Sequence, residues 1–163
     1  MKAYLNEKFI KLGEKKFYLF GPLASLLSDL ILIYYISAIF MPRMLSDKLL
    51  LKIIQTQYGP NMVPALDALQ LIRETSSSGM TIILFGFFLF HCVIAYNCYK
   101  RSAGSIKYLK GYTLSAVLLS IVELLTYLVK LHEFNIFTFM TMSLYFFTYY
   151  GLHYFEKAKK GGR

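Results

Sequence analysis

The stretch that decides the fold reads SLLSDLILIYYISAIF, from Ser25 to Phe40. It is apolar enough to lie in lipid, yet it contains the ionisable side chain of Asp29. A charged carboxylate near the middle of a bilayer costs at least about 2.5–3.5 kcal/mol on insertion scales, so it must be protonated, find a partner or face a protein interior. We therefore expect a bundle of helices that encloses Asp29.

Composition extends this expectation to the whole chain. Of its 163 residues 56% are hydrophobic and the mean hydropathy is +0.48, whereas soluble domains usually contain about 45–50% apolar residues. A spanning helix needs about 20 mostly apolar residues. Four windows provide them, at 22–41, 80–99, 112–130 and 134–155. We predict an all-α, polytopic membrane protein that forms a four-transmembrane-helix bundle in a single membrane domain, 1–163.

Shorter segments flank these windows. Residues 1–20 place Leu5, Phe9 and Leu12 at helical spacing among lysines, which predicts an N-terminal interfacial amphipathic helix. The only sizeable outer segment is 42–79, and its apolar residues also recur at helical spacing. We expect it to form two short amphipathic helices on the outer surface of the bundle.

Proline and glycine set the expected ends of these helices. Pro22 suits the first position of the first span, because its missing N–H would be unpaired there. In the outer segment, Ser46 is the expected cap of a helix that Gly59-Pro60 ends, and Pro64 is the expected start of a second. Residues 75–79 are expected to form a flexible return to the membrane.

The net charge of +9 predicts the orientation. Most basic residues precede the first window, lie in the expected inner loop Lys100–Lys110, or follow the fourth window in the tail 156–163. By the positive-inside rule, the protein is an integral, multi-pass membrane protein with both termini in the cytoplasm. Membrane phosphates account for the basic residues, so membrane lipids and no nucleic acid are the expected partners.

Polar residues form a stripe on each of the last two predicted spans. Their alternating steps of three and four place each set on one helix face. Only residues 131–133 separate the two spans, so we expect an antiparallel hairpin whose stripes face each other. The stripes consist of Thr113, Ala116, Ser120, Glu123, Tyr127 and Lys130 in the third span, and Asn135, Thr138, Thr141, Tyr145 and Thr148 in the fourth.

The ionisable residues inside the windows are the candidate site. At about 1.5 Å of rise per residue, Asp29 and His91 fall within about 2 Å of each other in depth, and Glu123 lies roughly 7–8 Å further outward. An Asp–His hydrogen bond and a second acid suit proton exchange or the binding of a cation or amine. The predicted ligand-binding or proton-binding residues are Asp29, His91, Glu123, Tyr34, Tyr127, Thr141 and Thr148.

A structural interpretation accounts for the same residues. Asp29 and His91 can bond only to hold the first span against the second, while Glu123 stays protonated beside a hydroxyl group. For His91 this interpretation is favoured, since one histidine is readily satisfied by a neighbouring carboxylate or carbonyl. Cys92 and Cys98 are expected to pack as small apolar groups, because their spacing matches no redox or zinc pattern.

Three functions follow from this pattern. The first is a small channel, transporter or ligand-binding protein whose polar core binds or conducts a proton, cation or cationic amphiphile. The second is a non-catalytic subunit or assembly factor of a larger membrane complex, and the third is a lipid-modifying membrane enzyme. The sequence favours a non-enzymatic role without a cofactor, since no nucleophile elbow, phosphate loop or zinc signature is present. It leaves open whether the chain forms a homo-oligomer.

The layout of four spans, with an acid in the first, a helical outer segment after it and a basic tail, resembles the emopamil-binding and sigma-2 receptor-like proteins. That resemblance implies the binding of sterols or amphiphilic amines. The chain departs from this layout because those proteins carry an acid in the second span, where this sequence has His91 and no carboxylate. No residue role is therefore transferred.

Overall fold

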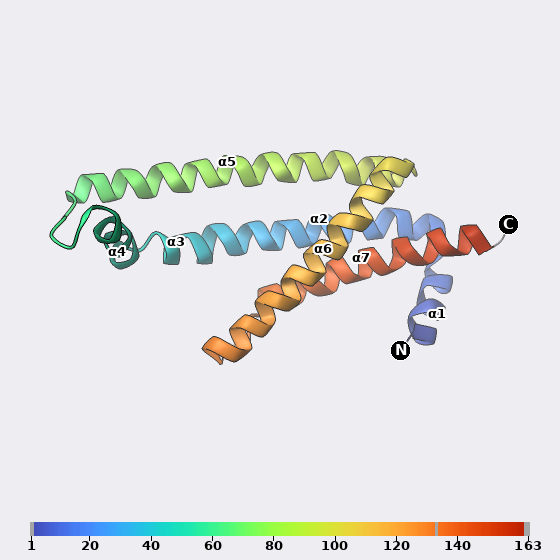
Figure 1. The fold of residues 1–163 in the computed structure, drawn as a ribbon. Helices are drawn as coiled ribbons and strands as arrows, with labels where there is room; N and C mark the ends of the chain where they lie inside the picture. The colour runs from blue at the N-terminus through green and yellow to red at the C-terminus, as the bar shows by residue number, and fades with distance from the viewer. Residues whose placement is uncertain (1, 133, 162–163) are drawn as a thin grey trace. The chain divides into compact units, whose positions relative to one another are not determined.

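The computed structural model describes residues 2–132 and 134–161, and helices account for most of them. No strand occurs in this part of the chain, which confirms the all-α class (Figure 1). In chain order the elements are α1 (Lys2–Leu12), α2 (Glu14–Tyr35), the π-helical turn η1 (Ile36–Phe40), α3 (Met41–Met44), α4 (Asp47–Tyr58), α5 (Leu66–Tyr99), α6 (Ala103–Thr126), the π-helical turn η2 (Tyr127–Leu131) and α7 (Ile136–Gly161).

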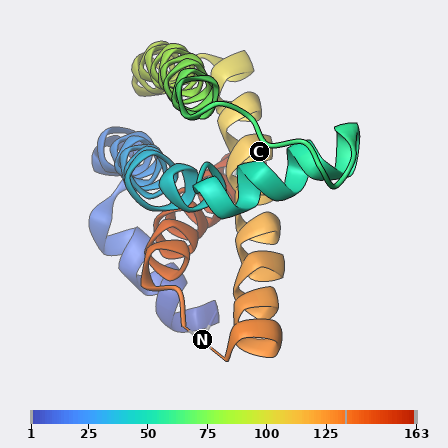
Figure 2. The ribbon, with the colours of Figure 1, turned by 90° about the vertical axis from the view of Figure 1, so that its left-hand side faces the viewer.

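The chain divides into two compact units, each described by itself. The core unit comprises residues 1–32 and 88–163, and so contains α1, most of α2, the end of α5, α6, η2 and α7. The arm unit comprises residues 33–87, with η1, α3, α4 and the start of α5. Within the core unit, α7 lies between α1 and α6 (Figure 2).

Helix α2 begins at Glu14, well before its expected start at Pro22. The break in the chain lies at Gly13, whose φ of +76° is in the left-handed region that glycine adopts without strain. The Gly13 N–H donates to the Phe9 carbonyl (3.0 Å), and the Gly13 carbonyl accepts from the Phe17 N–H (3.0 Å). Gly13 therefore ends one helix and starts the next, and Pro22 lies inside α2, where it removes one backbone donor.

Aromatic side chains fasten α1 to α7. The buried Phe9 ring stacks on Phe147, with 5.4 Å between ring centroids. A Cβ atom at Gly151 would overlap the Phe17 ring, so this close approach requires glycine. The predicted amphipathic segment 1–20 is thus α1 and the start of α2, and its place at a membrane surface stays a prediction.

In the arm unit, α4 covers the residues of the first helix expected in the segment 42–79, and the place of this segment on an outer surface stays a prediction. Ser46 occupies the N-cap position and Gly59, at φ +105°, the C-cap position. The Ser46 hydroxyl makes no capping hydrogen bond. Arg73, on α5, instead secures this helix start: its Nε donates to the Leu45 carbonyl (3.2 Å), and its guanidinium pairs with Asp47.

Helix α5 runs unbroken from Leu66 to Tyr99. The predictions of a separate helix opened by Pro64 and of a flexible return at 75–79 are therefore wrong. Residues 75–79 are helical, and the hydroxyl of Thr81, just after them, donates to the Ser77 carbonyl (2.9 Å). The glycine in the return costs a helix only about 1 kcal/mol. Ending the helix there would instead leave several backbone groups unpaired.

The expected basic loop Lys100–Lys110 is also mostly helical. A short turn contains Arg101 at φ +62°, Ser102 takes the N-cap position, and α6 begins at Ala103. Helix α6 therefore begins before the predicted window 112–130. Basic side chains near the end of a helix do not interrupt its backbone.

Helices α6 and α7 form the expected hairpin. They run in opposite directions, joined through η2 and His132 at φ +52° (Figure 1). Residue 133 of the predicted linker lies outside the described part of the chain.

Among the described residues, three helical stretches are long and apolar enough to cross a membrane. They are Glu14–Met44, Leu66–Tyr99 and Ala103–Val129. Helix α7 is not one of these stretches, so the fourth span stays a prediction, as do the orientation and the placement of the termini.

The core unit buries polar residues of α6 and α7 in addition to an apolar cluster that includes Phe17 and Leu152. On α6, Thr113 and Ser120 are buried, and on α7 so are Thr141 and Thr148. Soluble proteins bury their aliphatic side chains and expose their polar ones. Here large aliphatic side chains of α6 point outward instead, namely Leu118, Leu119, Val122 and Leu125.

Candidate functional site

Asp29 lies where four helices of the core unit meet. Its carboxyl belongs to α2 and is buried, with 1% of the residue exposed. Oδ2 lies 2.7 Å from Nδ1 of His91 on α5. Oδ1 accepts hydrogen bonds from the hydroxyls of Tyr112 on α6 (2.8 Å) and Tyr145 on α7 (2.6 Å). One carboxyl thus joins α2, α5, α6 and α7.

His91 extends this network toward the protein surface. The residue is 2% exposed, and its Nε2 lies 3.1 Å from the Tyr108 hydroxyl. Tyr108 is 38% exposed and lines a shallow hollow on α6 together with Lys107 and Tyr112. Two tyrosines one helical turn apart therefore connect the buried pair to this hollow, Tyr108 through His91 and Tyr112 directly through Asp29.

Three oxygen atoms at the centre of the network form a closed ring. The Tyr112 and Tyr145 hydroxyls, which both approach Oδ1 of Asp29, are also 2.9 Å from each other. All three separations have hydrogen-bond length, but each phenol carries one hydrogen. When both hydroxyls donate to an ionised carboxylate, the contact between them contains no hydrogen. A hydrogen on Oδ1 would supply the third bond.

The network offers no space for a bound molecule beside its acid. The side chains of Asp29 and His91 have accessible fractions of 0% and 1%. A cation or an amine would need surface on the carboxylate, since ligand sites are concave and open to their ligand.

Glu123 lies apart from this network. It is half-buried on α6, and its carboxyl interacts with the Thr138 side chain of α7. Backbone carbonyls link the two regions: the Ser28 hydroxyl donates to the Thr141 carbonyl (3.0 Å), and the Thr141 hydroxyl donates to the Thr138 carbonyl (3.0 Å). Asp29 and Glu123 therefore do not share one polar interior. Hydrogen bonds from side chains to backbone carbonyls lie between them.

The remaining predicted residues have different positions. Thr148 is buried and its hydroxyl donates to the Gly21 carbonyl (2.8 Å), which holds α7 against α2. The α7 stripe thus contacts α2 as well as α6. Tyr127 is half-buried in η2, and Tyr34 is exposed and belongs to the arm unit. A role for Tyr34 or Tyr127 at the site stays a prediction.

Sequence reasoning missed the phenols. The apolar pattern puts Tyr112 at the start of a window, although α6 begins about two and a half turns earlier. Tyr145 belongs to the predicted stripe of the fourth span, but the pattern gives it no binding role. The spacing of Tyr108 and Tyr112 by four residues places both on one helix face, and it is the signal that could have identified Tyr112.

Metal coordination is not supported within the described residues. No three His, Cys, Asp or Glu side chains there come together as ligands. Cys92 and Cys98 are free thiols, and Cys98 is buried among apolar side chains as expected. Comparison of the chain with protein-family models, curated proteins and solved structures found no match.

Proposed function

We propose that this chain is an integral membrane protein whose Asp29 network takes up one proton and exchanges it through Tyr112. The membrane placement is supported by the three long apolar helices and by the outward-facing aliphatic side chains of α6. Proton uptake is supported by the ring of three oxygen atoms. The ring has three contacts of hydrogen-bond length but only two phenolic hydrogens.

Charge favours uptake. With an ionised carboxylate and a neutral imidazole the network carries one negative charge, and such a charge inside a bilayer is unfavourable by at least about 2.5–3.5 kcal/mol on insertion scales. One added proton neutralises it. The groups that face Asp29 are His91 of α5, Tyr112 of α6 and Tyr145 of α7, and none of them brings a permanent charge.

Tyr112 provides the exchange step. It lines the surface hollow and touches Oδ1. Its O–H bond breaks as the hydrogen moves to Oδ1. A new O–H bond forms on the phenol with a proton from a hydronium ion in the hollow, which becomes water, and this new O–H bond then turns toward the Tyr145 hydroxyl. Afterwards each of the three ring oxygens donates one hydrogen bond and accepts one, and the network is neutral. Release follows the reverse path.

Of the ligands expected from the sequence, the geometry supports a proton over a cation or a cationic amphiphile. The carboxyl accepts three hydrogen bonds and has no accessible surface. A larger ligand would have to displace His91 or both phenols, which would break buried hydrogen bonds.

Infrared difference spectroscopy of the protein in lipid nanodiscs tests the proposal directly. The chain contains nine Asp and Glu residues, so acidification produces C=O stretches from several carboxylic acids. Subtracting the difference spectrum of Asp29→Asn from that of the wild type should leave the C=O stretch of one protonated carboxylic acid. Glu123→Gln is the control, because its carboxyl lies outside the ring, and it should keep the Asp29 signal. If this subtraction leaves no C=O stretch at any pH at which both proteins stay folded, the proposal is overturned.

Two tyrosine variants test the route without removing the acid. Tyr112→Phe removes the hydroxyl that reaches Oδ1, whereas Tyr108→Phe removes one from the same hollow that reaches only His91. After a pH jump, Tyr112→Phe should slow the appearance of the carboxyl signal at least tenfold, and Tyr108→Phe should change it less than threefold. Equal rates in the two variants would contradict the route through Tyr112.

A second candidate is a structural subunit of a larger membrane complex. The observation that favours it is that the same network joins four helices and is buried. In that case the subtraction leaves no carboxyl signal from Asp29, while Asp29→Asn still weakens the bundle.

A further inference from the structure

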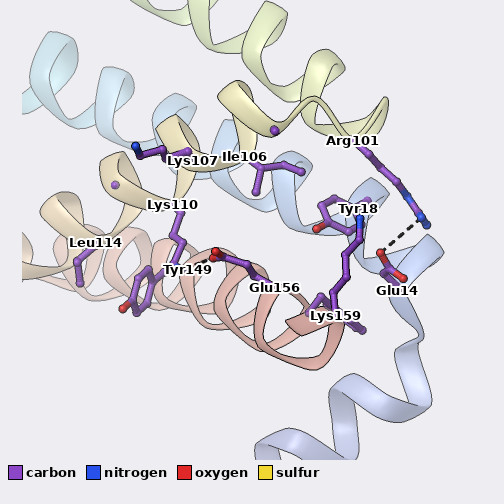
Figure 3. Close-up of a pocket in the computed structure, with 13 residues that line it drawn as sticks. Glu14, Tyr18, Arg101, Ile106, Lys107, Lys110, Leu114, Tyr149, Glu156 and Lys159 are labelled. Carbon is purple, nitrogen blue, oxygen red and sulfur yellow. Dashed lines mark hydrogen bonds and ion pairs between the residues drawn. The ribbon is translucent and has the colours of Figure 1, made fainter. Parts of the chain in front are cut away.

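We infer that a cavity at one end of the core unit binds the phosphate group of an anionic phospholipid. The cavity has a volume of about 640 Å³ and lies where α2 begins, where α5 turns into α6 and where α7 nears its end (Figure 3). This inference rests on the membrane placement proposed above and is independent of proton uptake.

The cavity lies at the ends of all three stretches that can cross a membrane. Glu14, the first residue of one stretch, lines it, and so do Arg101 and Ala103, at the turn between the other two. Basic side chains at the ends of spanning helices lie at the level of the lipid headgroups. The cavity is therefore at the depth where phosphate groups are found.

Positive charge exceeds negative charge around the cavity. Arg101 pairs with Glu14 (3.4 Å), and Lys110 pairs with Glu156 (2.5 Å). Lys159 also lines the cavity and has no ion pair among the described residues. In Figure 3 its side chain rises from α7 toward Tyr18 of α2. An anion in the cavity can accept hydrogen bonds from Lys159 and from the guanidinium nitrogens of Arg101 that do not contact Glu14. Neither Glu14 nor Glu156 has to be displaced.

Lys107 adds charge at the margin. It lines this cavity and also the hollow beside Tyr108, and in Figure 3 its side chain extends away from Lys159. It therefore attracts an anion to this end of the molecule without being needed as a direct ligand.

The rest of the wall favours a lipid over a free anion. Ile106, Leu114 and Phe155 present apolar surface, and Leu114 lies further along α6 from the charged end. A small, fully hydrated anion gains nothing from such surface. A phospholipid gains from both parts, because its phosphate meets the cations and its acyl chains follow the apolar side of α6.

Native mass spectrometry of the full chain, titrated in detergent with phosphatidylglycerol or phosphatidylcholine, tests the site. The wild type should bind the anionic lipid about tenfold more tightly than the zwitterionic one. Lys159→Gln should weaken phosphatidylglycerol binding about tenfold, since one charge-assisted contact to phosphate is lost.

The matched control is Lys157→Gln. It removes the same charge two residues away on the same helix, but Lys157 lines a different hollow. It should change phosphatidylglycerol binding less than twofold. Equal weakening by both substitutions, or none by either, in a protein that still binds lipid would overturn the site while leaving the membrane placement intact.

Inorganic phosphate distinguishes the two sources of the anion. If the lipid occupies the cavity, millimolar phosphate should displace little phosphatidylglycerol. Complete displacement, with the same sensitivity to Lys159→Gln, would overturn the lipid assignment in favour of a free phosphate ion.

Discussion

Asp29 on α2 and Glu123 on α6 are both carboxylic acids within apolar helices, but their surroundings differ. Asp29 is buried and touches polar groups from three other helices. Glu123 is half-buried and interacts with one threonine side chain. The two carboxylic acids therefore have different structural roles. Asp29 connects four helices of the bundle, and Glu123 lies in the contact between α6 and α7.

The largest expected effect separates the two acids by stability. Asp29→Ala removes the acceptor of three hydrogen bonds and leaves His91, Tyr112 and Tyr145 without it, so it should lower the free energy of unfolding by about 3–5 kcal/mol. Glu123→Ala should change it by about 1 kcal/mol or less. Reversible unfolding in mixed micelles measures both. Similar values for the two variants would remove the distinction drawn between the acids.

Removing one partner from each acid sharpens the comparison. Tyr145→Phe deletes a buried hydroxyl that donates to Asp29 and should lower the free energy of unfolding by about 1.5–3 kcal/mol, as for hydrogen bonds to charged groups. Thr138→Val deletes the partner of Glu123 and should cost about 0.6 kcal/mol, typical of polar contacts between membrane helices. The same unfolding assay measures both. If Thr138→Val lowers the free energy of unfolding more than Tyr145→Phe does, then Glu123 and not Asp29 is the acid that connects the bundle.

The smallest expected effect concerns the link between the two regions. Ser28→Ala removes the hydroxyl that donates to the Thr141 carbonyl and should lower the free energy of unfolding by about 0.6 kcal/mol. If Ser28→Ala destabilises the bundle as much as Asp29→Ala does, Asp29 and Glu123 belong to one continuous core. The distinction between the two acids would then be wrong.

Helix boundaries show where local patterns mislead. The glycine and hydroxyl residues at 75–79 and the proline at 22 are typical of helix ends, yet α5 and α2 continue through them. The sequence pattern predicts no helix end at Gly13, yet α1 ends and α2 begins there. Single-residue preferences amount to about 1 kcal/mol for glycine and about 3 kcal/mol for proline, and neighbouring turns and packing can exceed these amounts.

The amino-acid sequence by itself predicted that the chain is helical and that Asp29 and His91 lie at matching levels of their helices. It also predicted four apolar spans, and three helical stretches of the structure are long and apolar enough to cross a membrane. Hydropathy and helical periodicity are local quantities, so they can be read without a fold. Only the tertiary structure decided which acid acquired partners and which phenols supplied them. That choice depends on the rotation and axial offset of each helix against its neighbours, and no spacing within one helix contains either quantity.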